Sequence, residues 1–470
     1  MEWPWHKLKR LEGLEEQVAQ QQRVITELKA ENERLRRLLE EAQRASKRQA
    51  APFSRRKPKA HPLQPGRKAG SRYGTPCRRP IPEEMDQTLE AVLPECCPCG
   101  GPIRETRIEW QYQTEVPPPR VERTGFRVHV GECQQCGRRV QGRHARQTSD
   151  ALGAAASQLG PRAIALATQL NKQMGLSYGK TAVVLQELFG LSVSRGGLSQ
   201  ALEKVAKKAE PTYEKLIEQV RSSASVTPDE TGWKVGGKLW WMWAFSTAEV
   251  TVYSIQPGRG FEQAAAILGA AYAGFLVRDG WIIYPRFVGA VHQSCLNHLL
   301  RRCKEMREMV PTGAAQFPCQ VQEILQAALE LRNRRDQDQI SAHGLAVARG
   351  RLEIQMDDLL DKSYRSPLNR RLAKHLRRER EALFPFLYCS GLEATNYRAE
   401  QAIRPMVVTR KVWGGNRTPR GAHTQSVLGS VLQTCRQQKQ PPIPVLQQLL
   451  CLPEPIALDL THLHGPPPST

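Results

Sequence analysis

The sequence of 470 residues lacks any run of about 18 apolar residues, the length with which a helix crosses a bilayer, so we expect no membrane span. It also lacks the pattern of a secretion signal, because no apolar stretch follows a basic start at the N-terminus. We therefore expect no membrane partner. Apolar residues make up 40% of the chain, which is enough to bury cores, and the length is too great for one core. We expect two to four domains.

Acidic residues are scarce relative to basic ones. The chain has 46 Asp and Glu residues against 68 Lys and Arg residues, which leaves a net charge of +22. Residues 43–82 contain 12 Lys and Arg residues and no acid, so this segment cannot bury a core. The excess of positive charge predicts a polyanionic partner, most simply nucleic acid. We expect a basic, flexible linker over 43–82 that neutralises DNA phosphates; a solvated linker without that role is the alternative.

Cysteine is infrequent, with 12 residues, but several cysteines are paired. Two C-x-x-C-G motifs contain Cys96 and Cys99, and Cys133 and Cys136. In a cytosolic chain such pairs favour zinc over disulfides. Four thiolates at this spacing suit a tetrahedral structural Zn²⁺ ion, and the glycine after each pair permits a tight turn. We predict a zinc-ribbon-like module over 83–148, with unliganded thiols as the alternative.

The segment between the two cysteine motifs alternates apolar and polar residues in Ile108–Val116 and Val121–Val130, which predicts the two strands of a hairpin. The set of zinc ligands is not unique. Cys97 could replace its neighbour as the partner of Cys99, and His144 is a weaker substitute ligand.

The first 42 residues carry a heptad pattern that predicts a leucine-zipper coiled coil over 1–42. Asn32 occupies one seam, where a buried amide favours a defined register. We expect a homo-oligomer formed through this helix; a single amphipathic helix packed on its own domain is the alternative. The two seams consist of Leu11, Val18, Ile25, Asn32 and Leu39, and of Leu14, Gln21, Leu28 and Leu35.

Residues 149–222 are predicted to form a helical DNA-binding domain. Pro161–Met174 and Tyr178–Leu188 have helical patterns, and a third helix begins after the N-cap Ser194. A short turn with a glycine between two helices is typical of a helix-turn-helix, in which Arg195 would face the DNA groove. An ordinary three-helix bundle is the alternative.

Residues 225–255 predict three strands in a meander, the first two joined by a Gly-Gly turn. A helix over Phe261–Leu268 follows, and then a buried strand that ends at Asp279. Asp229 lies on the first strand. This is the order of elements in the ribonuclease-H-like fold, where the first and fourth strands are neighbours, so the two carboxylates can converge. For either aspartate alone, a role as a cap or turn residue is the alternative.

A third acid is expected from a later helix. Glu400 is the candidate, and Asn396 precedes it by four residues and shares its helix face. Carboxylate oxygens suit Mg²⁺, and two such ions can stabilise the attacking and leaving oxygens in phosphoryl transfer. Further along, a basic, glycine-bearing segment that includes Arg410 and Lys411 could hold the DNA backbone.

Together these residues resemble the transposases of the insertion-sequence-66 family (TnpC type), within the DDE/ribonuclease-H-like superfamily. The resemblance covers roughly the whole chain in the same order. Where the family usually has two adjacent asparagines before its glutamate, the second is Tyr397 here. The motifs that carry the resemblance are Asp229-Glu230-Thr231, Val277-Arg278-Asp279-Gly280, Cys295-Leu296-Asn297-His298-Leu299, and Asn396 and Glu400 with Arg404-Pro405 and Arg410-Lys411.

The resemblance implies a multidomain α+β protein. A ribonuclease-H-like α/β catalytic domain occupies 223–298 and 384–436, a helical insertion occupies 299–383, and a C-terminal tail with no assigned role occupies 437–470. By the same resemblance, Asp229, Asp279 and Glu400 form the catalytic triad that binds two Mg²⁺ ions, and Arg404, Arg410 and Lys411 contact DNA.

The resemblance also implies a reaction. Metal-activated water attacks the phosphodiester at a terminal inverted repeat, and the freed 3′-hydroxyl attacks target DNA. Such enzymes act in the bacterial cytoplasm, at the nucleoid, often with small accessory proteins. A catalytically inactive or domesticated DNA-binding protein is the alternative, and a nuclease that does not join ends is a third reading.

Cys295 and His298 form a C-x2-H motif of the kind that follows the second aspartate in several DDE families. With His292 and Cys303 nearby, the motif could bind a second zinc ion. We expect instead that Cys295, His298 and Asn396 position the catalytic groups, with His298 hydrogen-bonded near the site.

Overall fold

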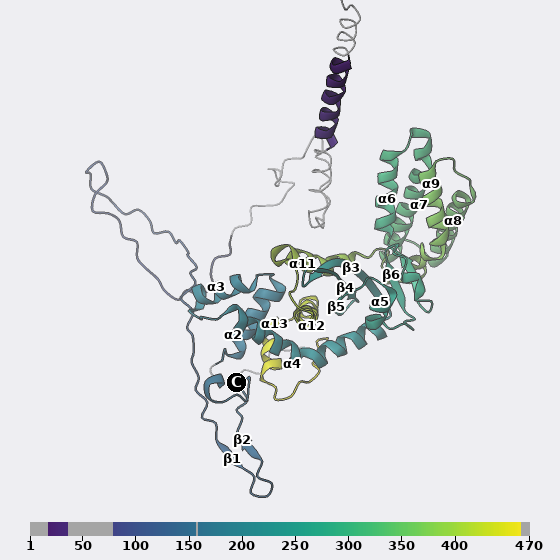
Figure 1. Cartoon of the computed structure of the whole chain (residues 1–470). Helices are drawn as coiled ribbons and strands as arrows, with labels where there is room; N and C mark the ends of the chain where they lie inside the picture. The colour runs from purple at the N-terminus through teal and green to yellow at the C-terminus, as the bar shows by residue number, and fades with distance from the viewer. Residues whose placement is uncertain (1–16, 36–78, 157, 462–470) are drawn as a thin grey trace, which may run out of the picture. The chain divides into compact units, whose positions relative to one another are not determined.

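The structure, a computed structural model, describes residues 17–35, 79–156 and 158–461 (Figure 1). Contacts within the chain divide it into two compact units, residues 1–115 and 116–470. The division falls inside the predicted zinc-binding module. Most of the predicted basic linker, the outer heptads of the predicted coiled coil and the last residues of the tail lie outside the described residues.

The first unit contains a helix over residues 17–35, and every residue of that helix is exposed. Its heptad residues Val18, Ile25, Leu28 and Leu35 are between 45% and 63% exposed. The apolar seams of this helix are therefore not covered by the described residues of its own unit. Its association with another helix stays a prediction.

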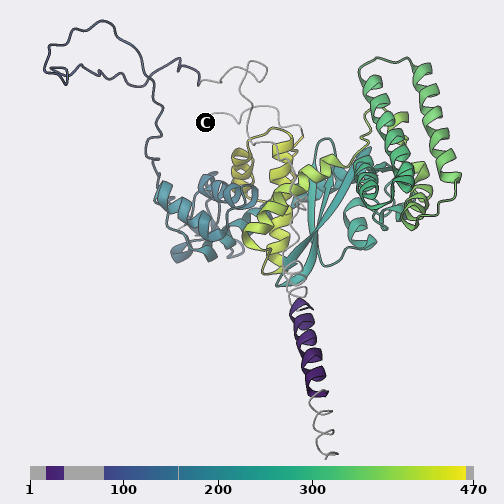
Figure 2. The ribbon, with the colours of Figure 1, turned by 90° about the horizontal axis from the view of Figure 1, so that it is seen from above.

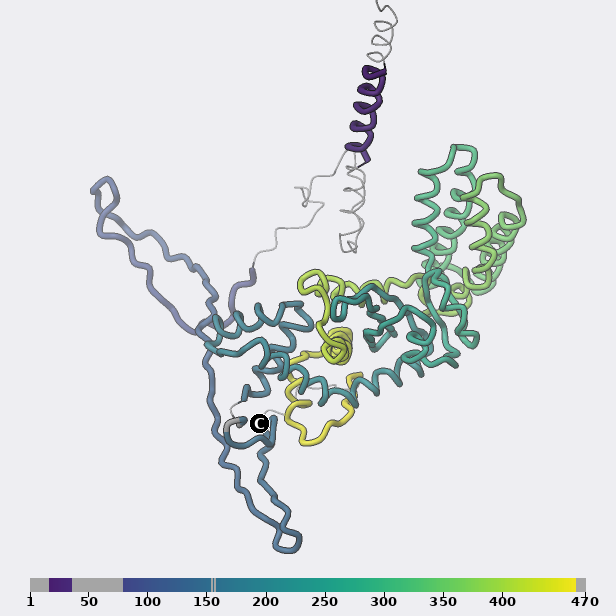
Figure 3. Tube along the Cα trace, in the orientation of Figure 1, coloured from purple at the N-terminus to yellow at the C-terminus, as the bar shows by residue number. Residues whose placement is uncertain are grey.

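The predicted hairpin around Ile108–Val116 and Val121–Val130 is wrong. Apart from Val130 itself, these segments form no strand, and Figure 3 shows them as an extended trace. Ile108 and Val116 are at least 75% exposed, so the alternating side chains have no layer to pack against, and an isolated hairpin is marginal in water. A shorter pair forms instead, from β1 (Val130–Glu132) and β2 (Arg139–Gln141), around the second cysteine motif.

The predicted helices of residues 161–208 are confirmed. The first is α2 (Pro161–Thr168), which continues as the π-helical η3 (Gln169–Gln173), and the second is α3 (Tyr178–Phe189). The third, α4 (Arg195–Ser222), begins at the predicted cap, because the Ser194 side chain accepts a hydrogen bond from the N–H of Gly197. It runs about four turns beyond the predicted end at 208 and packs against β5 and α12.

The central sheet has five strands in the order β5-β4-β3-β6-β7. The predicted meander is confirmed, and so are the helix α5 (Phe261–Leu268) and the strand after it. β3 and β4 are antiparallel, as are β4 and β5, whereas β3, β6 and β7 run parallel to one another. The strands are β3 (Ser225–Val235), β4 (Lys238–Ser246), β5 (Thr251–Gln256), β6 (Phe275–Arg278) and β7 (Val291–Ser294).

The helix α12 (Pro419–Gln437) covers the β5 edge of this sheet, and Figure 2 shows it lying along the strands. Three of its hydroxyl side chains, one helical turn apart, accept hydrogen bonds from alternate N–H groups of β5. The N–H of Ile255 donates to Ser426 Oγ at 3.0 Å, that of Tyr253 to Ser430 Oγ at 2.8 Å, and that of Thr251 to Thr434 Oγ1 at 3.2 Å. The edge strand is thus paired without a further strand.

The predicted insertion over 299–383 is largely helical, as expected. Its helices form a core of their own, which also includes Val277 of β6, and in Figure 1 they stand together beside β6. The chain then returns through α10 (Pro385–Tyr388) to α11 (Tyr397–Trp413), which packs on β3 and β4. The insertion comprises α6 (Leu296–Met309), α7 (Thr312–Asp336), α8 (Ala342–Asp361), α9 (Pro367–Arg378) and the short η5 (Arg380–Ala382).

The described residues after α12, 438–461, do not form a loose tail, contrary to the prediction. They form α13 (Pro442–Cys451), which buries Leu446 and Leu449 against α2 and α4. A following strap is held by Lys215, whose Nζ lies 2.9 Å from Asp459 Oδ2. The many glutamines and prolines of this segment concealed a helix with one apolar face. Among the described residues, no helix is both long enough and apolar enough to cross a membrane.

Removing the hydroxyl group of Ser430 should destabilise the protein. Ser430→Ala leaves the buried N–H of Tyr253 without its acceptor, so we expect a loss of about 1–3 kcal/mol in the free energy of unfolding, measured by urea denaturation. Ser222→Ala is the matched control, because that exposed hydroxyl donates to the Glu218 and Gln219 carbonyls of its own helix. It should cost less than about 0.5 kcal/mol. Equal midpoints for the two variants would contradict this account of α12.

Candidate active site

The strands β3 and β6 bring the two predicted aspartates to the same level of the sheet. Ser225 pairs with Phe275 and Val226 with Leu276, so each aspartate lies three residues beyond its paired neighbour. Beyond this pairing, Asp229 continues along β3, opposite Ala244 of β4, whereas β6 ends before Asp279. The parallel pairing of β3 with β6 is therefore what places Asp229 and Asp279 at neighbouring positions.

Asp229 is partly buried among negative charges. Burial is the main cause that raises its pKa from 3.8 to about 8, and the charges of Glu230, Asp279 and Glu400 act in the same direction. The N–H of Glu230 donates to Asp229 Oδ1 at 2.9 Å, which opposes the shift without cancelling it. The charges of Asp279 and Glu400 therefore both act on Asp229, which supports the prediction that the three acids belong to one site.

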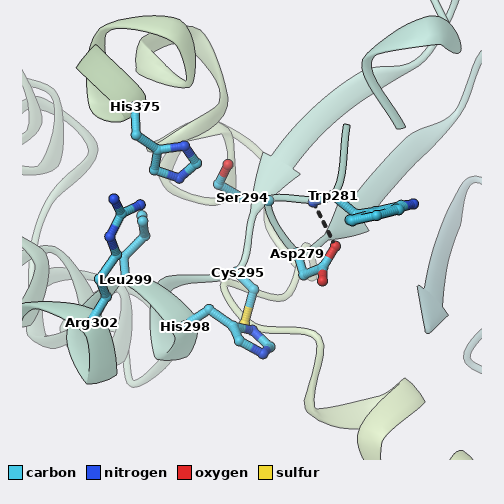
Figure 4. A pocket seen from close by; sticks show the side chains of 9 residues that line it. Asp279, Trp281, Ser294, Cys295, His298, Leu299, Arg302 and His375 are labelled. Atoms are coloured by element: carbon cyan, nitrogen blue, oxygen red, sulfur yellow. Dashed lines mark hydrogen bonds between the residues drawn. The ribbon is translucent and has the colours of Figure 1, made fainter. Parts of the chain in front are cut away.

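Asp279 follows β6 and lines a pocket of about 380 Å³ (Figure 4). The N–H of Trp281 donates to Asp279 Oδ1 at 2.9 Å, which holds the carboxylate at the turn after the strand. The other lining residues are Gly280, Trp281, Ser294, Cys295, His298, Leu299, Arg302 and His375.

Glu400 lies in the first turn of α11, where its N–H donates to the Asn396 carbonyl at 3.1 Å. Its side chain is 38% exposed, and Oε1 lies 3.9 Å from Nε2 of His298. An acid in the first turn of a helix is favoured by the helix dipole. The predicted triad thus comes from the first and fourth strands in chain order and from α11.

The three predicted positioning residues are in contact with one another or with the triad. The Cys295 thiol donates to Asn396 Oδ1 at 2.9 Å and accepts from the Asn396 N–H at 3.3 Å, which joins the start of α6 to the start of α11. Burial raises the pKa of Cys295, so its sulfur remains a protonated donor. Burial lowers the pKa of His298, and the nearby charge of Arg301 lowers it further. Asp279 and Glu400 act on His298 in the opposite direction.

Glu230 is a residue for which sequence reasoning found no role. Its side chain is 2% exposed and forms an ion pair with Arg259, whose Nε lies 2.8 Å from Oε1. The hydroxyl of Tyr284 donates to Oε2 at 2.6 Å. The Arg259 guanidinium stacks 3.7 Å from the ring centre of Trp281 and 4.6 Å from that of Trp241. Only the adjacency of Glu230 to Asp229 could have pointed to this cluster.

A second buried ion pair joins the insertion to β6. Arg278 donates to Glu379, and both side chains are at most 4% exposed. Ser294 Oγ also donates to Glu379 Oε2, at 2.7 Å. Burial by itself would raise the pKa of Glu379, but the charge of Arg278 and these hydrogen bonds hold it below its usual value. The pair holds the helical insertion at a fixed place beside Asp279.

The predicted DNA-contacting residues are in different surroundings. Arg195, Arg404 and Lys411 are exposed. Arg410 is half-buried and donates to Thr231 Oγ1 at 3.0 Å and to the Gly232 carbonyl, so its guanidinium binds the strand that carries the first aspartate.

The loop after α11 is also joined to β3. Asn416 Oδ1 accepts from Trp233 Nε1 at 2.8 Å, and the Asn416 N–H donates to the Lys234 carbonyl at 2.8 Å. Gly415 has a φ of +117° and approaches so closely that a Cβ would lie 2.2 Å from the Lys234 oxygen, so only glycine fits there.

Each cysteine motif forms a tight turn within its own unit. Gly100 and Gly137 have φ values of +84° and +67°, and the N–H of Gly137 donates to the Cys133 carbonyl at 2.8 Å. Hydrogen bonds from the backbone of Gly101, and secondly from Cys97, lower the pKa of Cys99.

Hydrogen bonds from the backbone of Cys136 and then of Gln135 likewise lower the pKa of Cys133, which favours thiolates in both turns.

Among the described residues, however, no three His, Cys, Asp or Glu side chains stand in an arrangement that could hold a metal ion. The triad acids therefore interact through their charges and are not arranged as a coordination shell.

Comparison with known proteins gives one family and one relative. Residues 156–424 match the family described as "Transposase IS66 family". The uncharacterized protein y4qI of Sinorhizobium fredii is 25% identical over 307 residues, which are 58% of this chain and 55% of that protein. The match spans about half the length of that relative.

The raised pKa of Asp229 predicts a pH dependence of stability. A folded protein that binds this proton more tightly than the unfolded chain loses stability as pH rises from about 4 to about 8. In buffer without Mg²⁺, Asp229→Asn should remove that part of the loss and raise the free energy of unfolding at pH 8 by on the order of a few kcal/mol. Asp361→Asn, exposed at the end of α8, is the control. Parallel stability profiles for wild type and Asp229→Asn between pH 5 and 8 would refute the assignment.

Proposed function

The chain belongs to the IS66 transposase family, because residues 156–424 match that family. We propose that it cuts and joins DNA by the DDE reaction. The substrates in this proposal are the terminal inverted repeats of a bacterial insertion sequence and a target DNA. The observation that carries it is that the negative charges of Asp279 and Glu400 act on the partly buried Asp229 at one end of the central sheet.

The sheet supports a ribonuclease-H-like catalytic domain. Its order β5-β4-β3-β6-β7, with β4 antiparallel to both its neighbours and β3, β6 and β7 parallel, puts the first and fourth strands side by side. The helix α11 returns to this sheet after the insertion and supplies the third acid. The proposed catalytic domain therefore occupies 223–298 and 384–436, with the insertion over 299–383 between the two parts.

The three acids fit divalent metal ions by their chemistry. Carboxylate oxygens are the ligands that Mg²⁺ prefers, and a buried aspartate with a raised pKa beside two further acids is stabilised by a cation. When bound, two Mg²⁺ ions would supply stabilisation for the negative charge that develops on the attacking and leaving oxygens. Asp229, Asp279 and Glu400 would hold them.

The remaining residues of the site orient these acids. Cys295 and Asn396 fix the start of α11, and with it Glu400, while His298 lies against that carboxylate. Arg410 holds β3 just beyond Asp229. In the reaction, water attacks the phosphodiester at the end of the element, and the freed 3′-hydroxyl then attacks target DNA. No side chain becomes bonded to DNA, unlike the nucleophilic serine or tyrosine of other recombinases.

We further propose how the rest of the chain serves this reaction. The exposed Arg195 at the start of α4, with Arg404 and Lys411 on α11, contacts DNA. The helix over 17–35 associates with other copies through its exposed heptad residues, which the oligomeric state of the full chain in solution tests. Small accessory proteins are further proposed partners. An inactive DNA-binding relative would bind the same DNA without cutting it.

Substituting any of the three acids should abolish cleavage while leaving DNA binding intact. Asp229→Asn, Asp279→Asn and Glu400→Gln each remove a carboxylate without changing side-chain size, so we expect Mg²⁺-dependent nicking of labelled terminal DNA to fall at least about 100-fold. A gel-shift assay measures binding in parallel, and Asp361→Asn is the control. Near-normal nicking by any one of the three variants would remove that residue from the mechanism. Cleavage by the wild type without joining of 3′ ends would leave a nuclease.

The cysteine motifs are proposed to bind structural zinc through Cys99, Cys133, Cys136 and either Cys96 or Cys97. We expect metal analysis of the purified full chain to find about one zinc ion per chain. Cys136→Ser should lose it, because four-coordinate sites rarely tolerate a missing thiolate. Cys389→Ser, which changes a cysteine of α10's end instead, should retain it. A wild-type protein that contains no zinc and is nonetheless folded, as judged by circular dichroism, would contradict this proposal.

A further inference from the structure

The pocket beside Asp279 has walls of different origin and different charge. One wall comes from the sheet and carries the Asp279 carboxylate. The other comes from the helical insertion, which contributes Arg302 of α6 and His375 of α9. In Figure 4 these two side chains stand across the pocket from Asp279. Within the proposed catalytic domain, an insertion that only filled space would not need to present Arg302 and His375 here, in addition to His298 of α6.

Arg302 has no partner for its charge within the described part of the chain, where it forms neither a hydrogen bond nor an ion pair. Glu379, the residue that follows α9, cannot serve as the partner of Arg302. Its carboxylate already binds Arg278, Ser294 and Arg378. Burial lowers the pKa of Arg302, and the charge of Arg378 adds to that effect. A guanidinium nonetheless stays charged in proteins, so this half-buried cation faces the pocket without an ion-pair partner among the described residues.

His375 offers a hydrogen-bond donor in a defined direction. Its Nδ1 lies 3.1 Å from Nη2 of Arg378, and because a guanidinium can only donate, Nδ1 is the acceptor. The proton of the neutral ring therefore sits on Nε2. Nε2 lies 3.5 Å from the place where a Cβ of Gly280 would be, so the absence of a side chain at Gly280 lets the imidazole lie over the turn after Asp279.

We propose that this pocket binds a phosphate group of the DNA strand, distinct from the phosphate that is attacked, with Arg302 and His375 as its donors. The inference rests on the proposed function, since it assumes that DNA occupies the site at Asp279. A guanidinium fork matches phosphate oxygens in shape and charge. The Arg278–Glu379 pair fixes the insertion against β6, so the donors are held in place before DNA binds.

A phosphate suits the pocket better than a nucleobase does. A base would require an aromatic face to stack on, and the one indole in the lining, Trp281, already stacks with Arg259 at 3.7 Å. The insertion therefore contributes a contact to the DNA backbone, which fixes the position of the strand without reading its sequence.

The test combines a protein variant with a DNA modification. The full-length protein is titrated with a fluorescent duplex that carries the DNA end flanking its coding sequence, in a series where one phosphate at a time is a neutral methylphosphonate. For the wild type we expect one position near the cleaved bond to weaken binding about tenfold. In Arg302→Gln the same substitution should weaken binding less than about twofold, because the interaction is already lost.

The control is Arg307→Gln, which removes the same charge from the far, exposed end of α6 and should keep the full tenfold sensitivity. His375→Phe, which removes the Nε2 donor, should lose part of the sensitivity at the same phosphate, and Arg302→Lys should restore part of it. Arg302 makes no hydrogen bond within the described chain, so its substitution is not expected to disturb folding, and circular dichroism checks this. If each methylphosphonate weakened DNA binding by Arg302→Gln as much as it weakens binding by the wild type, the proposal would be overturned.

Failure of the phosphate site and failure of the proposed function give different results, because binding is read without catalysis. A wild type that shows the coupled phosphate but never nicks DNA in Mg²⁺ would keep the site and reject the transposase reaction. A wild type that cuts and joins DNA without any phosphate coupled to Arg302 would reject the site alone. A wild type that binds no DNA would overturn both.

Discussion

The burial of Asp229 beside the charges of Glu230, Asp279 and Glu400 is the constraint on which the arrangement of the second unit depends. Carboxylates partly removed from water and placed beside one another oppose folding, as the raised pKa of Asp229 shows. They remain together because each belongs to an element that is held by other contacts. β3 is bound by Arg410, β6 by the buried pair of Arg278 and Glu379, and the start of α11 by Cys295.

On both strands the charged residue next to the aspartate forms an ion pair of its own. Glu230 follows Asp229 and is paired with Arg259, and Arg278 precedes Asp279 and is paired with Glu379. Glu230, Arg278 and Glu379 are buried, and Arg259 is 29% exposed, so loss of a partner would leave a buried charge alone. The two networks reach different parts of the molecule. The first extends through Arg259 to Trp281 beside Asp279, and the second to the helical insertion, so the geometry of the site depends on segments distant in sequence.

Local patterns predicted the elements that carry the site but not the contacts that hold them. The meander, α5, the strand before Asp279 and the cap at Ser194 follow from alternation, turn residues and capping, which act over a few residues. Glu230 and Arg259 are 29 residues apart, and Arg278 and Glu379 are 101 apart, so no periodicity links them. Alternation misled at Ile108–Val116, because a strand also needs a surface to pack on. Zinc binding and DNA contacts remain predictions.

The hydroxyl groups of α12 have a consequence for the order in which the chain can fold. β5 is made long before α12, which begins at Pro419, and until that helix leaves the ribosome the N–H groups of Thr251, Tyr253 and Ile255 have no acceptor. An uncovered strand edge is a template for pairing with another chain. The β5 edge is thus protected from pairing with another chain only once nearly the whole polypeptide has been synthesised. A protein cut short before Pro419 would lack α12 and would have an aggregation-prone edge.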